Sequence, residues 1–140
     1  MNLMQSQYAD RAVLRAKSEI ESNNHELAWK YLEEAHIFSQ PDAAMHVYVH
    51  WKMFQLAKKQ RDRSEILGQV LRLLLALPSS VFRVYPAGNN GRSNVGLFSP
   101  MPLSKRNEKK MRELEKLEKR RIEAGGTLQK YQRQHPLTRR

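Results

Sequence analysis

The sequence contains no cysteine among its 140 residues. Disulfide bonds and thiolate metal ligands are therefore excluded, and a cytoplasmic protein is the default expectation for such a chain. Long hydrophobic runs are missing too. The longest, VLRLLLAL at residues 70–77, is interrupted by Arg72 and falls far short of the roughly 20 residues that span a bilayer. The first 20 residues also lack the pattern of a secretion signal.

Recognisable catalytic and nucleotide-binding motifs are absent as well. No serine lies in a nucleophile-elbow motif, and neither a Rossmann nor a zinc-finger pattern occurs. The segment PAGNNGRSN at residues 86–94 lacks the Lys-Ser/Thr pair of a phosphate-binding loop, so it predicts a turn. The sequence therefore indicates no nucleotide cofactor and identifies no reaction.

Hydrophobic periodicity predicts four helices before residue 79, at about residues 6–21, 25–39, 43–60 and 64–77. We expect Asn24 and Asp42 to cap the second and third helices, and Pro78 to end the fourth. The third helix is apolar nearly all round, which favours a central position. In the fourth, the expected inward residues are all aliphatic: Ile66, Leu67, Val70, Leu71, Leu74 and Leu77.

Short connections between these helices imply antiparallel neighbours. The sequence thus predicts an all-α body, residues 1–103, built as a four-helix antiparallel bundle. The alternative is a stack of helical hairpins of the tetratricopeptide kind, because two 20-residue segments ending in proline recur 37 residues apart. Residues 79–103 are too rich in glycine and proline for a regular helix, yet apolar enough to lie back across the body.

The net charge of +11 is concentrated in residues 104–140, which carry 13 Lys/Arg and five Glu. This region predicts a basic charged helix followed by a disordered tail. Attraction to nucleic acid or an anionic membrane surface is only weakly suggested, because glutamates interleave with the basic residues and Tyr131 is the lone aromatic. A protein partner remains an open alternative.

Three histidines and a glutamate surround the break at Pro41. Glu33 and His36 share one face of the second predicted helix, and His46 and His50 share one face of the third. His36 and His46 are each five residues from Pro41, so an antiparallel hairpin places them at the same height. Glu33 and His50 lie eight and nine residues away, about one helical turn further on.

The four side chains could therefore converge as metal ligands. Three imidazoles and a carboxylate suit zinc, nickel, iron or copper, and disfavour calcium or magnesium. Gln40, Asp42 and Tyr48 are candidate outer partners of these ligands. The alternative is that these histidines are packing residues, because the rotation of each helix about its axis is unknown. His25 is expected to be structural and His135 incidental.

Several separated segments resemble the bacterial domain-of-unknown-function family 3703. They are HELAWKYLEEAHIFSQ, HVYVHWKM, EILGQVLRLLLALP and YPAGNNGRSNVGLFSPMP, within about residues 8–103. The resemblance implies histidines and a glutamine at positions matching His25, His36, Gln40, His46 and His50. It also implies a genomic neighbourhood of heavy-metal resistance, which favours metal binding; a metal-dependent enzyme would be an extension of that function. The basic extension lies outside the resemblance.

Overall fold

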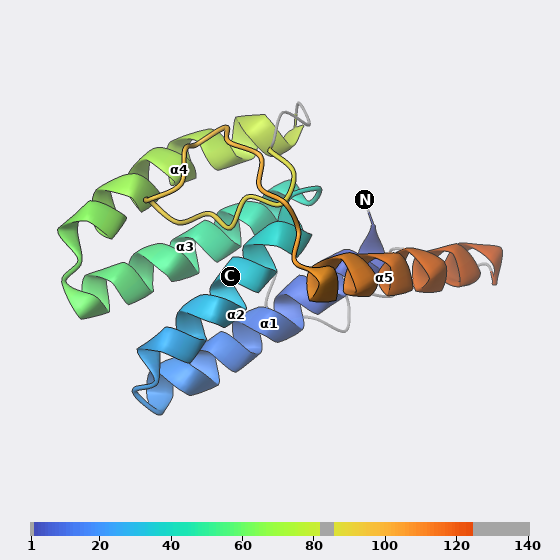
Figure 1. Ribbon diagram of the computed structural model, residues 1–140, viewed down its shortest axis with the longest axis horizontal. Coiled ribbons are helices and arrows are strands. Elements are labelled where there is room, and N and C mark those ends of the chain that lie inside the picture. The colour runs from blue at the N-terminus through green and yellow to red at the C-terminus, as the bar shows by residue number, and fades with distance from the viewer. Residues whose placement is uncertain (1, 82–85, 125–140) are drawn as a thin grey trace.

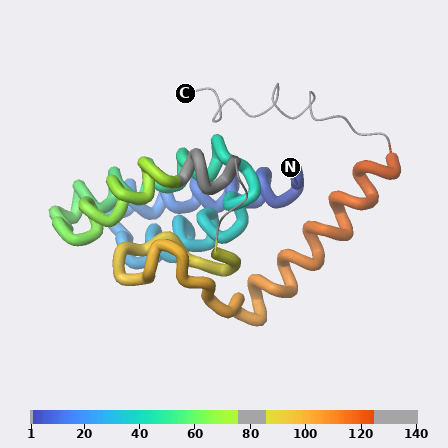
Figure 2. The backbone as a smooth tube through the Cα atoms, turned by 90° about the horizontal axis from the view of Figure 1, so that it is seen from above, coloured from blue at the N-terminus to red at the C-terminus, as the bar shows by residue number. Residues whose placement is uncertain are grey.

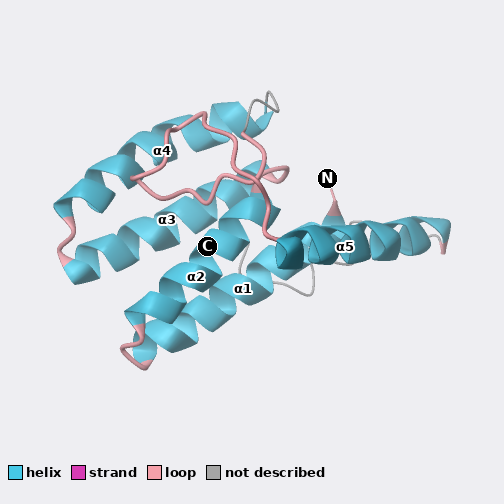
Figure 3. Cartoon of the chain, in the orientation of Figure 1, coloured by secondary structure: helices cyan, strands magenta, loops and turns pink. Residues whose placement is uncertain are grey.

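The computed structural model of the chain describes residues 2–81 and 86–124, and this part contains five helices and no strand (Figures 1 and 3). The prediction of an all-α fold is therefore confirmed. In chain order the helices are α1 (Leu3–Glu21), α2 (His25–Ser39), α3 (Ala43–Gln60), α4 (Arg63–Val81) and α5 (Lys105–Glu123). No helix in this part is both long and apolar enough to cross a membrane.

Side-chain caps define the starts of the central helices. The Asn24 side chain accepts a hydrogen bond from the Leu27 amide at 3.4 Å, and Asp42 accepts one from the Met45 amide at 3.1 Å. Each cap satisfies an amide that has no partner within its own helix. Both caps, and the predicted ranges 25–39 and 43–60, are confirmed.

The helices are arranged as two hairpins. α1 packs along α2 and α3 along α4, and the hairpins meet mainly through α2 and α3 (Figure 1). α3 therefore contacts helices on both sides and buries Met45, Val49 and Met53 completely, as its apolar composition predicted. α1 and α4 make no extensive contact within the described residues, so closure into a four-helix bundle stays a prediction.

The predicted inward face of α4 is wrong for Leu67, Val70, Leu71 and Leu74, which are exposed; Ile66 does pack against the core, and the Leu77 side chain lies outside the described ones. Among the described side chains of α4, the buried ones are Glu65, Gln69 and Arg72, which recur at helical spacing on the side facing α3 and residues 86–95. By contrast, Leu67 is 67% exposed and Leu74 is 72% exposed. The reason is that α4 lies at the edge of the layer, where the polar side chains form hydrogen bonds that the leucines cannot make.

The end of α4 also differs from the prediction. We expected Pro78 to end the helix at Leu77, but α4 continues to Val81. Proline removes one backbone hydrogen bond and often kinks a helix, but a final turn can still follow it.

The segment after α4 lies across the body, as expected, but polar contacts hold its first half there. Asn89 and Gly91 are buried, and the Arg72 guanidinium donates a hydrogen bond to the Arg92 carbonyl at 2.7 Å. Phe98, which we expected to be buried, is 63% exposed, whereas Val95, Leu97 and Met101 are half-buried. The predicted contacts of Val81, Phe82, Val84 and Tyr85 lie outside the described side chains.

α5 runs at an angle to the other helices (Figure 2). Leu114 packs into the core against α1, and a Glu118 carboxylate oxygen accepts a hydrogen bond from the Met4 amide at 3.1 Å. This carboxylate lies at the amino-terminal end of α1, where the helix dipole favours negative charge. The predicted division into residues 1–103 and 104–140 remains a prediction, and the expected disordered tail, including His135, lies outside the described residues.

Candidate metal centre

Three buried imidazoles converge between α2 and α3. The His36 Nε2 atom lies 2.9 Å from the His46 Nε2 atom and 3.1 Å from the His50 Nε2 atom. The ring centroids of the three pairs are 4.6 to 4.8 Å apart. His36, His46 and His50 could hold a metal ion, since one nitrogen of each lies within 4.8 Å of the others. We call these residues the histidine triad.

The turn at Pro41 explains why the triad forms. His36 and His46 are equidistant from this turn, so they face one another at the same height on α2 and α3. His50 is one turn further along α3 and on the same face as His46. The His36 ring therefore reaches both histidines of α3, and the three rings occupy one cluster rather than the two successive levels that the spacing predicted.

The partner of His36 determines where its ring proton lies. The His36 Nδ1 atom is 2.7 Å from the backbone carbonyl oxygen of Asn89. A carbonyl oxygen can only accept a hydrogen bond, so Nδ1 must carry the proton in the neutral ring. The Nε2 atom of His36 is consequently unprotonated, with its lone pair directed at the other two rings.

The tautomer of His50 is assigned through Gln69. The Gln69 amide nitrogen donates hydrogen bonds to a Glu65 carboxylate oxygen at 2.7 Å and to the Gly91 carbonyl at 2.8 Å. Both are acceptors, so the amide oxygen of Gln69 faces His50, whose Nδ1 atom lies 2.8 Å away. His50 therefore donates from Nδ1, and its Nε2 atom also presents a lone pair.

Two nitrogen lone pairs thus face each other across 3.1 Å without a proton between them. Such a contact is unfavourable in a buried site unless a cation, or a proton on the Nε2 atom of His46 at 2.9 Å from His36, lies among the nitrogens. The Nδ1 atoms of His36 and His50 donate hydrogen bonds to a carbonyl and to an amide oxygen. Metal-bound histidines commonly make such a bond with the ring nitrogen that does not bind the metal. The arrangement is therefore suited to a cation.

The three imidazoles are held in their neutral form. Burial lowers the pKa of His46 to about 3, with His50 contributing. Burial also lowers the pKa of His50 to about 4, although its hydrogen bond to Gln69 acts in the opposite direction. The pKa of His36 falls well below its ordinary value through burial and the charges of His50 and His46. Neutral imidazole is the form that binds a metal.

Glu33 does not lie in the triad. Its carboxylate is half-buried and pairs with the Arg92 guanidinium at 3.1 Å. Arg92 also pairs with Glu65 at 3.1 Å and lies 3.9 Å above the Trp29 ring. Because Glu33 precedes His36 by three residues, its side chain lies one turn away along α2. At that level the segment after α4 supplies the positively charged side chain of Arg92. The sequence prediction did not include Arg92.

Gln40, Asp42 and Tyr48 have other partners than the imidazoles. Gln40 donates a hydrogen bond to the Pro86 carbonyl at 2.9 Å and so holds the segment after α4. Asp42 caps α3 and accepts a hydrogen bond from the Ser6 hydroxyl at 2.7 Å. The half-buried Tyr48 ring lies 5.1 Å from the Lys52 ammonium. His25, expected to be structural, is the first residue of α2.

The sequence prediction missed the residues that orient the triad. Gln69 comes from α4, and Asn89 comes from the irregular segment. Gly91 lies directly against His36, since a Cβ atom at this position would be 2.7 Å from the ring. One signal was present: Glu65, Gln69 and Arg72 form a polar stripe at helical spacing on an otherwise apolar helix. Such a stripe indicates buried polar partners.

Comparison with protein families matches residues 4–111 to the family described as protein of unknown function (DUF3703). The chain belongs to the DUF3703 family. The match contains the whole histidine triad, Gln69 and Asn89, so the DUF3703 region includes both the imidazoles and the groups that orient them. It also extends into α5, beyond the region that the sequence resemblance covered. No curated protein and no solved structure shows a significant match to this DUF3703 chain.

Proposed function

We propose that this DUF3703 protein binds a transition-metal ion through the Nε2 atoms of His36, His46 and His50. The observation that supports the proposal is the pair of buried, unprotonated nitrogens of His36 and His50, 3.1 Å apart. A metal ion accepts both lone pairs and removes their repulsion. Without a metal, the donor within reach among these rings is a proton on the Nε2 atom of His46, 2.9 Å from the His36 Nε2 atom.

The distances fit a tetrahedral ion after a small adjustment. Zinc bound to imidazole at about 2.0–2.1 Å requires ligand nitrogens roughly 3.3 Å apart. The two separations from the His36 Nε2 atom, 2.9 and 3.1 Å, are slightly shorter, so His36 would need to move away from His46 and His50 by only a few tenths of an ångström. Three neutral imidazoles favour zinc, nickel, iron or copper over calcium and magnesium.

Three protein ligands leave a fourth position, because the Glu33 carboxylate is bound to Arg92. Zinc sites with three protein ligands can admit water or a substrate there. However, all three imidazoles are buried, so we propose binding alone and treat metal-dependent catalysis as an extension. The cysteine-free composition remains the reason to expect this function in the cytoplasm.

Elemental mass spectrometry on untagged protein tests the proposal. We expect about one transition-metal ion per chain, or uptake of one from zinc, nickel, iron or copper salts. A His46→Ala/His50→Ala variant should lose the metal, whereas His25→Ala should retain it because His25 lies outside the triad. Helical circular dichroism establishes that each variant folds. No metal in the native protein and no uptake would make the histidines packing residues.

Cobalt(II) gives a second test that does not depend on these variants. We expect the visible spectrum of a cobalt ion with nitrogen ligands, at one equivalent per chain, and its displacement by zinc. An octahedral spectrum, identical to that of cobalt in buffer, would contradict binding by the triad.

The outer face of α4 favours a second candidate function, association with a second copy of this chain. Leu67, Val70, Leu71 and Leu74 are all exposed there, and Trp51 on the neighbouring helix α3 is 45% exposed. Their exposed parts add up to roughly 500 Å² of apolar surface, near the upper end of what monomeric proteins expose in one patch. The only charged side chain of α4 after Glu65 is Arg72, which is buried.

The absence of charge on this face is the argument for a second copy. The chain carries a net charge of +11, so two copies repel one another over most of their surfaces but not here. Sedimentation or light scattering should show a dimer that Leu67→Glu/Leu74→Glu converts to a monomer. Leu14→Glu, at an exposed leucine of α1, should leave the dimer intact. A native monomer at high concentration would refute this candidate.

A further inference from the structure

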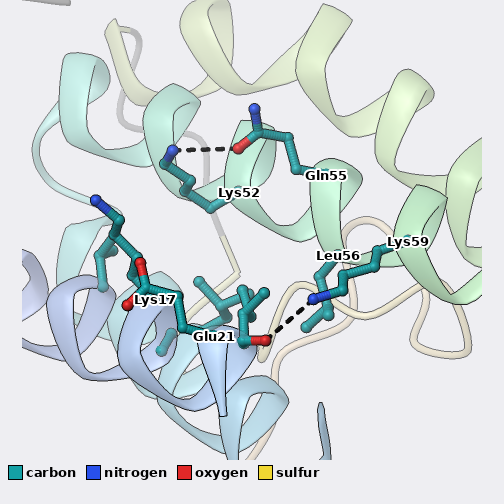
Figure 4. A pocket seen from close by; sticks show the side chains of 10 residues that line it. Lys17, Glu21, Lys52, Gln55, Leu56 and Lys59 are labelled. Carbon is teal, nitrogen blue, oxygen red and sulfur yellow. Dashed lines mark hydrogen bonds between the residues drawn. The ribbon is translucent and has the colours of Figure 1, made fainter. Parts of the chain in front are cut away.

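A cleft lies between α1 and α3, away from the histidine triad (Figure 4). Its volume is about 320 Å³, which lies within the range of small-molecule sites. The floor is formed by aliphatic side chains from three helices: Val13, Ala16, Ile20, Leu32 and Leu56. All of them except the half-buried Ile20 are buried. The cleft therefore offers a binding surface for an apolar group.

Three lysines surround this apolar floor. Lys17 comes from α1, and Lys52 and Lys59 come from α3 (Figure 4). Lys52 donates a hydrogen bond to the Gln55 side-chain oxygen at 3.1 Å, and Lys59 donates one to the Ile20 carbonyl at 3.0 Å. These bonds hold two of the ammonium groups in defined places, one of them at the carboxyl-terminal end of α1.

The rim of the cleft is positively charged. Glu21 is the one acidic residue among those that line it, so the lining carries a net charge of +2. Within the described residues, none of the three ammonium groups lies within 4.0 Å of a carboxylate. Burial and the charge of Lys17 lower the pKa of Lys52, as expected for cations that share a partly desolvated rim.

We propose that this cleft binds a small amphiphilic carboxylate, with its hydrocarbon chain on the aliphatic floor and its carboxylate at the Lys17–Lys52 side of the rim. The volume accommodates roughly ten non-hydrogen atoms, because a water molecule occupies about 30 Å³. An eight-carbon fatty acid has that size. The carboxylate relieves the repulsion between the two ammonium groups, and the chain lies against the half-buried Ile20 and the aliphatic stems of the lysines, above the buried floor.

Charge complementarity selects the anion over other apolar ligands. A neutral alcohol of equal length gains the same contact with the floor but leaves the ammonium groups unpaired. An alkylammonium ion adds a third cation to the rim. The site lies outside the histidine triad, so this inference does not depend on the metal proposal.

Isothermal titration calorimetry of the full chain tests the inference, with octanoate as the probe and 1-octanol and octylammonium as comparisons. We expect octanoate to bind at one site, about tenfold more tightly than 1-octanol. Octylammonium should bind more weakly than either. Increasing salt should weaken octanoate binding and leave 1-octanol unchanged, because only the carboxylate is screened. Equal affinities for octanoate and 1-octanol, or no binding of octanoate, would overturn the proposal.

Substitutions locate the site. Lys17→Met/Lys52→Met keeps the aliphatic stems and removes both charges, so octanoate affinity should fall about tenfold while 1-octanol affinity stays constant. Lys58→Met is the matched control, because Lys58 is an exposed residue of α3 outside the cleft. If the double variant does not fold, each single variant should show a threefold loss. An equal loss in the Lys58→Met variant would place binding elsewhere.

Discussion

Lowering the pH from 7 to 5.5 should destabilise the metal-free protein markedly through the histidine triad. In the unfolded chain each histidine titrates near pH 6.5. In the folded protein the pKa is about 3 for His46 and about 4 for His50, and it is also lowered for His36. Between these values the unfolded state binds more protons than the folded state. The free energy of unfolding therefore falls as the pH falls through 6.5.

The magnitude follows from the two numerical pKa values. Each histidine that stays neutral when folded and is protonated when unfolded costs about 1.4 kcal/mol per pH unit. For His46 and His50 together, the change from pH 7 to pH 5.5 is about 2.5 kcal/mol, and His36 adds to it in the same direction. This is a substantial part of the 5–15 kcal/mol by which a typical domain is stable.

Urea unfolding followed by tryptophan fluorescence, to which Trp29 and Trp51 both contribute, measures this effect, with a chelator present to keep the triad metal-free. The chosen pH range keeps the contributions of carboxylates small, since those titrate below about pH 5. Replacement His50→Gln should reduce the pH dependence by about one third. Stability that is constant between pH 7 and 5.5 would refute the reasoning, as would an unchanged pH dependence in the His50→Gln variant.

Two further substitutions test the surroundings of the triad and the attachment of α5. Gly91→Ala should cost about 2 kcal/mol of stability and abolish zinc uptake, because Gly91 has φ +79° and its Cβ would lie 2.7 Å from the His36 ring. Gly88→Ala, at φ +73°, would instead press its Cβ against the Met101 carbonyl oxygen, away from the triad, so it should cost stability and keep the zinc. Loss of zinc in both variants would contradict this reasoning. Glu118→Gln should lower the free energy of unfolding by about 1 kcal/mol, because the carboxylate caps the start of α1. The control Glu115→Gln, at an exposed residue, should leave the free energy of unfolding unchanged. Equal melting temperatures of the two variants would show that this cap is unimportant.

The predictions from sequence succeeded where local chemistry decides the structure. Asn24 and Asp42 cap the helices whose ranges were predicted to the residue. The two caps and Pro41, which follows α2, act within one turn of the chain. Their effect therefore does not depend on the rest of the fold. The meeting of His36 with His46 was also predictable, because the rise per residue fixes which positions lie opposite one another across a hairpin.

What the sequence could not decide is the rotation of α4 and the path of the segment that follows it. Hydrophobicity placed Leu67 and Leu74 inward, yet the fold turns Gln69 inward because the imidazole of His50 and the carbonyl of Gly91 require a hydrogen-bonding partner. That requirement exists only after distant parts of the chain come together.

Glu33 shows the same difference between what the sequence and what the tertiary structure determines. Its position on α2 was predictable, but its partner was not, since Arg92 is 59 residues away along the chain. The sequence by itself determined the helices, their hairpin at Pro41 and the histidines that face each other across it. Only the tertiary structure decided which nitrogens carry protons, because carbonyl and amide groups from α4 and the irregular segment assign them. Local interactions act along the chain, whereas tautomers and helix rotations depend on neighbours that folding supplies.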